Sequence, residues 1–229
     1  MRYDFTRAAK KFIYVLKRIN QFRFRQVGRG MIKAVVFDFG GVLAEEGFRE
    51  GLTAIGEKNG LNPEDFFMIA GELVYQTGYV TGMSDESEFW HAVREKTGIT
   101  GADKELRSEI LKRFVLRPAM LKLVEELKAL GLITAILSDQ TNWLDEINRG
   151  MPFFHYFDYV FNSFNLKKGK RDPSVFRDIC SAVGLRPEEV LFVDDNIENI
   201  RRALGEGLNA VHFRSIGSFQ SEISTFIKT

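Results

Sequence analysis

Short, mostly apolar runs that end at a polar residue or a glycine recur along the chain. They are Lys33–Phe37, Leu132–Leu137, Asp158–Phe161, Val190–Val193 and Asn209–His212. Strands that are buried in a parallel sheet show this pattern, because helices cover both of their faces. We therefore predict that each run forms a buried parallel strand.

Helix-like segments lie between several of these runs. Their bounds are Pro118–Leu130, Pro173–Val183 and Glu198–Glu206, and the glycine that follows each of them is Gly131, Gly184 or Gly207. Glycine commonly ends a helix because it readily adopts a left-handed conformation. The alternation of strand and helix predicts an α/β core with a doubly wound, Rossmann-like parallel sheet.

Residues 45–117 break this alternation, because they contain no convincing strand and look helical throughout. The segment directly follows the first predicted strand, at the carboxyl edge where open α/β sheets bind their ligands. We predict that it forms a small helical cap domain. The core would then consist of residues 31–44 and 118–229.

The first 30 residues form a basic segment, with nine Lys and Arg residues against one acid, Asp4. Its apolar residues recur at steps of four and three, which gives one apolar helical stripe: Phe5, Ala9, Phe12, Leu16 and Ile19. This pattern predicts a basic amphipathic N-terminal helix. The helix would pack on the body, precede a true start at Met31, or contact an anionic membrane or a protein partner.

Composition narrows the class of protein. The single cysteine, Cys180, cannot form an internal disulfide, which fits a reducing cytoplasm. No apolar run approaches the roughly 18 residues of a membrane-spanning helix, and the near balance of 32 basic and 31 acidic residues argues against a nucleic-acid partner. The histidines, His91, His155 and His212, lack metal-ligand spacing and are expected to be structural. We expect a soluble cytoplasmic protein.

Polar residues that could take part in binding or catalysis lie where three of the predicted strands end. The first strand is followed by Asp38, the second by Ser138 and Asp139, and the fourth by Asp194 and Asp195, while Lys170 precedes a helix. The carboxyl ends of strands converge in a doubly wound sheet, so these side chains are expected to share one crevice.

Such a set of groups suits phosphoryl transfer. Several carboxylates in one crevice repel each other unless a cation neutralises them, and oxygen ligands alone suit Mg²⁺. An ammonium and a hydroxyl would hold an anionic substrate oxygen. A carboxylate that is free to attack phosphorus gives an acyl-phosphate intermediate.

Four motifs, in order, resemble those of the haloacid dehalogenase superfamily of aspartate-nucleophile hydrolases. They are VVFDFGGVL, AILSDQ, KRDPSVF and FVDDNIENI, and the resemblance covers residues 32 to about 215. Within the superfamily the chain is similar to the branch with a helical cap after the first motif. That branch includes small sugar-phosphate phosphatases and the phosphatase domain of soluble epoxide hydrolase.

The resemblance implies a role for each matching residue around the substrate. Asp38 would be the nucleophile, and Lys170 would be the lysine that steadies the phosphate. Ser138 and its neighbour Asp139 would stand at the phosphate-binding position of the second motif.

The resemblance also implies a Mg²⁺ site. Its ligands would be Asp38, the backbone carbonyl of Gly40, and Asp195 with Asp194 beside it. Asn199 would lie behind these ligands and support them.

Three positions depart from the family pattern. Phosphatases of the family usually carry a second aspartate two residues after the nucleophile, which acts as acid and base, and this chain has Gly40 there. A substrate group, a metal-bound water or a cap residue such as Glu45 or Glu46 could compensate. Asp139 replaces the usual asparagine, and Arg171 replaces the usual proline.

These observations support three hypotheses. The first is a Mg²⁺-dependent phosphatase that acts on a small phosphorylated metabolite, such as a sugar phosphate, through an aspartyl-phosphate. The second is a degenerate family member that binds a phosphorylated ligand or a partner with little turnover, as the residues Gly40 and Asp139 suggest. The third is a metal-independent 2-haloacid dehalogenase, which the adjacent pair Asp194 and Asp195 disfavours.

Overall fold

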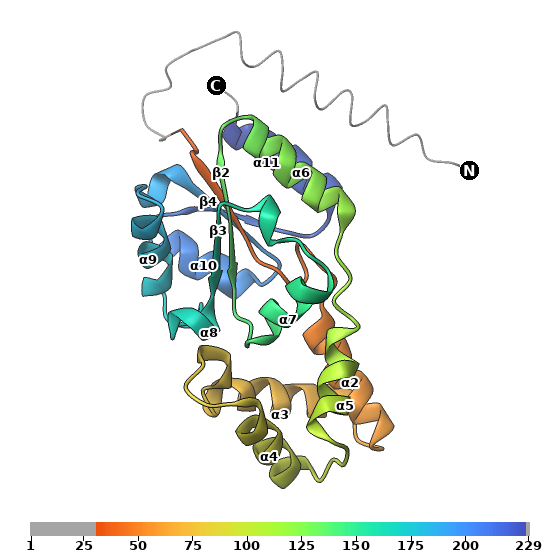
Figure 1. The fold of residues 1–229 in the computed structure, drawn as a ribbon. Helices are drawn as coiled ribbons and strands as arrows, with labels where there is room; N and C mark the ends of the chain where they lie inside the picture. The colour runs from red at the N-terminus through yellow and green to blue at the C-terminus, as the bar shows by residue number, and fades with distance from the viewer. Residues whose placement is uncertain (1–30, 228–229) are drawn as a thin grey trace, which may run out of the picture.

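The computed structural model describes residues 31–227, which form a five-stranded sheet flanked by helices (Figure 1). All neighbouring strands are parallel, in the order β3-β2-β1-β4-β5. The strands are β1 (Ala34–Phe37), β2 (Ile133–Ser138), β3 (Tyr159–Asn162), β4 (Val190–Asp194) and β5 (Asn209–His212). The prediction of a doubly wound parallel sheet is therefore confirmed, and each strand begins and ends within one residue of its predicted run.

Helices cover both faces of the sheet. Along β1, Ala34 and Val36 pack in one hydrophobic cluster and Val35 and Phe37 in the other, as the alternation of side chains along a strand requires. The first cluster is closed by α9 (Ser174–Ala182) and α10 (Ile197–Gly205). The second includes side chains of α6 (Pro118–Ala129), α7 (Trp143–Gly150) and α11 (Ile216–Ile227).

The predicted helices α6, α9 and α10 are present, with ends within one residue of those expected. The sequence analysis missed α7 and α11, and also the short α8 (Ser163–Leu166) and the 3₁₀ turns η2 (Phe154–Tyr156) and η3 (Pro187–Glu189). Most of these elements are short, with eight residues or fewer, and α11 is rich in serine.

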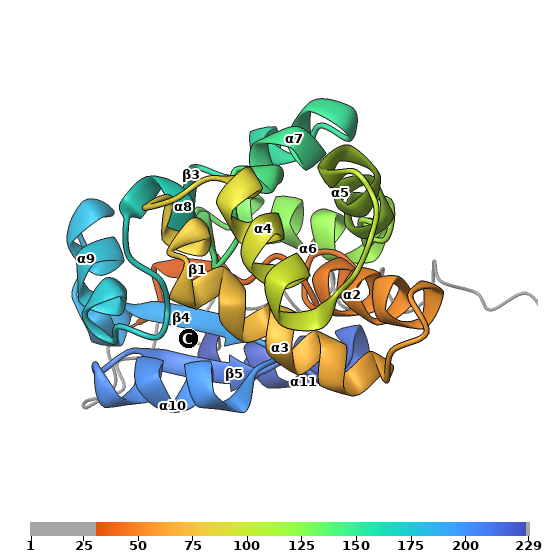
Figure 2. The ribbon, with the colours of Figure 1, turned by 90° about the horizontal axis from the view of Figure 1, so that it is seen from below.

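A helical insertion separates β1 from α6 and lies beyond the end of the sheet (Figures 1 and 2). It contains α2 (Gly47–Lys58), α3 (Pro63–Gln76), the 3₁₀ turn η1 (Tyr79–Thr81), α4 (Glu86–Thr97) and α5 (Asp103–Leu111). Local sequence sets its helix starts: Asn62 accepts hydrogen bonds from two backbone N–H groups of α3, and Asp85 accepts one from α4. The insertion follows β1, so it covers the edge where the strands end.

An aromatic cluster joins this insertion to the core. Trp143 of α7 is fully buried and stacks on Trp90 of α4, with 6.2 Å between ring centroids. The ring of Tyr79 meets Trp143 edge-on at 5.7 Å, and the Tyr79 hydroxyl donates a 2.6 Å hydrogen bond to Asn142. Paired aromatic rings bury large areas and favour such offset and edge-on arrangements.

The basic N-terminal segment predicted over residues 1–30 lies outside the described residues. Across residues 31–227, no helix has the length and apolar character that crossing a membrane requires.

Removing the Trp143 side chain should destabilise the whole protein. We expect Trp143→Ala to lower the free energy of unfolding by about 3–5 kcal/mol, because the truncated site leaves a cavity between insertion and core. Urea denaturation measures this change. Leu204→Ala, at a residue that is 53% exposed, is the control and should cost far less. Equal losses in the two variants would contradict a stabilising role for Trp143 in the aromatic cluster.

Candidate active site

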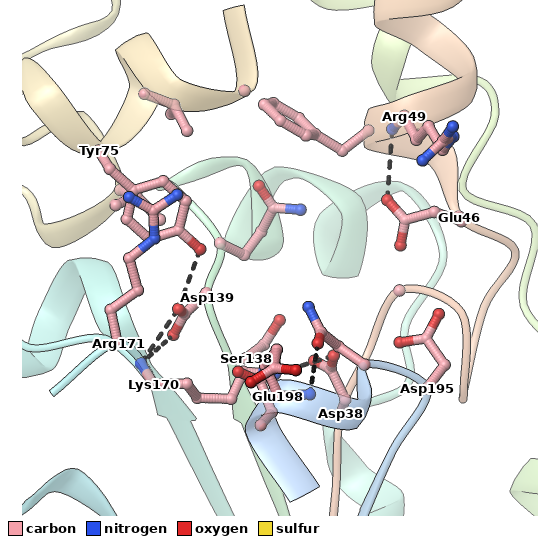
Figure 3. A pocket seen from close by; sticks show the side chains of 18 of the residues that line it. Asp38, Glu46, Arg49, Tyr75, Ser138, Asp139, Lys170, Arg171, Asp195 and Glu198 are labelled. Carbon is pink, nitrogen blue, oxygen red and sulfur yellow. Dashed lines mark hydrogen bonds and ion pairs between the residues drawn. The ribbon is translucent and has the colours of Figure 1, made fainter. Parts of the chain in front are cut away.

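The carboxyl ends of three strands bring the predicted functional residues together. Asp38 directly follows β1, Ser138 is the last residue of β2, and Asp194 is the last residue of β4. β1 pairs directly with both β2 and β4, so these ends are neighbours. They open into a cavity of about 720 Å³ beneath the helical insertion (Figure 3).

Lys170 lies at the centre of the charged groups in this site. Its Nζ lies 2.8 Å from an oxygen of Asp38 and 2.7 Å from an oxygen of Asp194. The Lys170 side chain is 3% exposed, that of Asp194 is fully buried, and that of Asp38 is 13% exposed toward the cavity. The structure therefore brings the predicted nucleophile, lysine and acid of the fourth motif into one ion-paired group.

Asp195 completes a cluster of carboxylates. One oxygen from each of Asp38, Asp194 and Asp195 lies within 4.8 Å of the others. Lys170 pairs with two of the three, so the cluster has an excess of two negative charges when all three acids are ionised. An oxygen-only donor set with this excess charge fits a divalent hard cation such as Mg²⁺.

Backbone and amide donors fix the direction of these carboxylates. Asp194 accepts hydrogen bonds from the backbone N–H of Asn196 at 2.7 Å and from the side-chain amide of Asn199 at 3.1 and 3.3 Å. Arg202 in turn donates to the Asn199 carbonyl at 2.9 Å. Asn199 thus holds the carboxylate of Asp194 in place.

Burial and mutual repulsion shift the acidity of the cluster. Burial raises the pKa of Asp38 well above its usual value, although the ammonium of Lys170 opposes this change. Burial, then the charge of Asp194, raises the pKa of Asp195. Burial alone would lower the pKa of Lys170, but the carboxylates of Asp194, Asp38 and Asp139 outweigh it and raise that pKa. The ammonium is therefore charged at neutral pH.

The glycine pair after Asp38 allows the chain to pass close to Asp195. Gly41 has a φ of 75°, in the left-handed region that glycine adopts at no steric cost. A Cβ at Gly41 would lie 2.1 Å from an oxygen of Asp195. Both conformation and space therefore require glycine at this position.

Asp139 uses its carboxylate to hold the loop that carries Lys170. It accepts hydrogen bonds from the backbone N–H of Lys170 at 2.8 and 3.0 Å and from the hydroxyl of Tyr75 in α3 at 3.1 Å (Figure 3). Ser138, beside it, lines the cavity and is 3% exposed. Tyr75 escaped the sequence analysis, because its partner lies 64 residues away along the chain.

Arg171 links the same loop to the insertion. Its guanidinium forms a two-point ion pair with Glu72 at 2.8 and 3.2 Å and lies 3.5 Å above the centre of the Tyr75 ring. The positive charge of Arg171, next to Lys170 in the chain, is therefore matched by an acid of α3.

Two further residues that the sequence analysis named, His212 and Glu46, line the cavity. His212 was expected to be only structural, yet it lines the cavity and its Nε2 lies 2.8 Å from the backbone oxygen of Asp195. Glu46, one of two candidate acids, lines the cavity, and burial raises its pKa to about 7. The other, Glu45, turns away and pairs with Arg117 at 2.8 and 3.1 Å.

A family model agrees with this geometry. The model for haloacid dehalogenase-like hydrolases matches residues 32–204, which is well over half of the 229 residues. The chain belongs to this hydrolase family, as its four motifs indicated.

Individual relatives include more than one chemistry. The chain is 31% identical, over 134 residues, to a phosphoserine phosphatase of Thermus thermophilus, a match that spans 55% of this chain and 53% of that protein. It is 24% identical to (S)-2-haloacid dehalogenase 4A of Burkholderia cepacia over 82% of this chain and 85% of the dehalogenase. This chain thus covers about half the length of the phosphatase.

The same fold occurs in a solved structure of a haloacid dehalogenase family enzyme from Bacteroides thetaiotaomicron. The two chains are 24% identical and superpose with a TM-score of 0.65, over 81% of this chain and 96% of that one. That enzyme was solved in complex with magnesium and inorganic phosphate.

Replacing Lys170 by the uncharged Met should destabilise the protein in EDTA. We expect Lys170→Met to cost about 3–5 kcal/mol, because it leaves Asp38 and Asp194 buried without their cation. Lys168→Met is the matched control. Lys168 lies two residues away, pairs with Asp178 at the surface, and should contribute far less to stability. Urea denaturation compares both variants, and a Lys170→Met variant as stable as the control would contradict this view of the site.

Proposed function

We propose that the protein is a Mg²⁺-dependent phosphatase that hydrolyses a small phosphorylated metabolite through an aspartyl-phosphate on Asp38. One observation carries this proposal: three carboxylates lie within 4.8 Å of one another, and the one buried ammonium, that of Lys170, pairs with two of them. A site of this composition needs a cation, and phosphoryl transfer is catalysed mainly by positioning and by charge neutralisation.

Each group has a task in the proposed reaction. Bound Mg²⁺ would be held by Asp38, Asp195, the carbonyl of Gly40 and the nearby Asp194, and would neutralise charge on the transferring phosphoryl group. Asp38 attacks phosphorus with the oxygen that Lys170 does not hold. Lys170 and the Ser138 hydroxyl then hold the phosphoryl oxygens.

Two features support a small phosphorylated substrate. The cavity of about 720 Å³ falls in the range of pockets for small molecules. The relatives include a phosphoserine phosphatase, and the enzyme with the same fold was solved with magnesium and phosphate. We propose that residues 45–117 act as a cap that keeps bulk water from the reacting atoms and selects the substrate.

A 2-haloacid dehalogenase is the second candidate, because such an enzyme is among the relatives. In that reaction Asp38 would attack carbon instead of phosphorus, without a metal. The adjacent acids Asp194 and Asp195 favour the phosphatase, because two more carboxylates beside the nucleophile make sense around a cation. Chloride release from 2-chloropropionate in EDTA would identify the dehalogenase.

Asp38→Asn should abolish phosphatase activity. We expect hydrolysis of p-nitrophenyl phosphate with Mg²⁺ to fall at least about 1000-fold, because the amide is a far weaker nucleophile. Asp65→Asn, at an exposed residue in the first turn of α3, is the control and should keep wild-type activity. A wild-type rate in Asp38→Asn would exclude the mechanism. A folded wild-type protein without activity on a panel of metabolite phosphates would favour ligand binding without turnover.

Mg²⁺ should stabilise the folded protein. At a concentration 100 times the dissociation constant, one bound ion adds about 2.7 kcal/mol to the free energy of unfolding. We therefore expect a higher melting temperature in MgCl₂ than in EDTA, and a smaller increase in Asp195→Asn. Equal increases in the two proteins would remove Asp195 from the proposed set of ligands. Calorimetry with Mg²⁺ measures the affinity directly.

A further inference from the structure

The backbone at Gly40 does not itself require glycine. Its φ lies outside the left-handed region, unlike that of Gly41. A Cβ at Gly40 would instead meet Oε2 of Glu46 at 2.7 Å, while the next residue, Phe114, lies at an ordinary 3.5 Å. The space that a side chain at position 40 would enter is therefore occupied by the carboxylate of Glu46.

The chain holds Glu46 in this place from two sides. Glu46 is the residue before α2, and its Oε1 accepts a 3.3 Å hydrogen bond from the backbone N–H of Arg49. Behind it, Gly47 packs so closely against Phe114 that a Cβ at Gly47 would lie 2.7 Å from the ring. Oε2 is thus directed toward Gly40 and the cavity that contains Asp38 (Figure 3).

Other acids that line the cavity are engaged elsewhere. Asp139 binds the Lys170 backbone and Tyr75, Glu72 pairs with Arg171, and Glu198 pairs with Arg201. Among residues 31–227, no lysine, arginine or histidine forms an ion pair with Glu46.

We infer that Glu46 is the general acid and base of the site, in the place of the side chain that Gly40 lacks. This inference rests on the proposed phosphatase function. It assigns the proton transfers to a residue at the start of the insertion, outside the motif that carries the nucleophile.

The proton and electron pairs balance over two steps. As Asp38 attacks phosphorus, the bond between phosphorus and the ester oxygen breaks, and that oxygen keeps the electron pair and takes the proton of Glu46. The Glu46 carboxylate then takes a proton from water as the water oxygen attacks the aspartyl-phosphate. The bond between phosphorus and Asp38 breaks, its electron pair returns to the Asp38 carboxylate, and Glu46 is protonated again.

The leaving group provides the sharpest test. Phenolate is a strong base that must be protonated as it leaves, whereas 2,4-dinitrophenolate leaves readily without a proton. In pre-steady-state assays with Mg²⁺, Glu46→Gln should release phenol from phenyl phosphate about 10²–10⁴-fold more slowly than wild type. Its first turnover of 2,4-dinitrophenyl phosphate should be nearly unchanged, followed by a slow steady state.

Glu45→Gln is the matched control. It removes the neighbouring carboxylate, which is bound to Arg117 outside the cavity, and should change neither rate. Equal slowing of both substrates in Glu46→Gln, or no slowing, would overturn the inference and leave the phosphatase function standing. A wild-type protein that hydrolyses neither substrate with Mg²⁺ would overturn both proposals.

A second experiment covers the case in which Glu46→Gln fails to fold. The double variant Gly40→Asp with Glu46→Ala moves the carboxylate to position 40 and frees the space that it needs. The double variant should hydrolyse phenyl phosphate at least about 10-fold faster than Glu46→Ala does. Gly40→Asp alone should be impaired, because its side chain would clash with Glu46. A double variant no more active than Glu46→Ala would contradict the inference.

Discussion

The ion-paired Lys170 is the interaction on which the rest of the site depends. Its ammonium contacts Asp38 and Asp194, and the three residues come from three separate segments of the chain. Burying charges is costly unless they are paired and hydrogen-bonded. Donors from Phe39, Asn196 and Asn199 meet that requirement for the two acids. The core of the protein can therefore contain a charged group in a fixed geometry next to an open cavity.

The sequence predicted the core of this arrangement well. Buried parallel strands are apolar on both faces, so their runs stand out, and the residues at their carboxyl ends must meet. Asp38, Ser138 and Asp194 could be placed for this reason alone. Helices α7 and α11 were not predicted, because α7 has only eight residues, α11 is rich in serine, and helices this short depend on tertiary packing for their stability.

The contacts between insertion and core lay beyond the reach of sequence patterns. Glu45 and Glu46 are adjacent acids, yet one binds Arg117 and the other faces Gly40. Glu46 caps the start of α2, and the next residue, Gly47, packs closely on Phe114, which lies far along the chain. Periodicity alone carries no information on such a contact.

One face of α3 binds the loop that carries Lys170 through two side chains. Glu72 and Tyr75 are three residues apart, so they project from the same side of the helix. One binds Arg171 and the other binds Asp139, which holds the backbone N–H of Lys170. A rigid displacement of α3 away from the sheet breaks both contacts together. The two contacts therefore couple the position of the loop that carries Lys170 to that of α3.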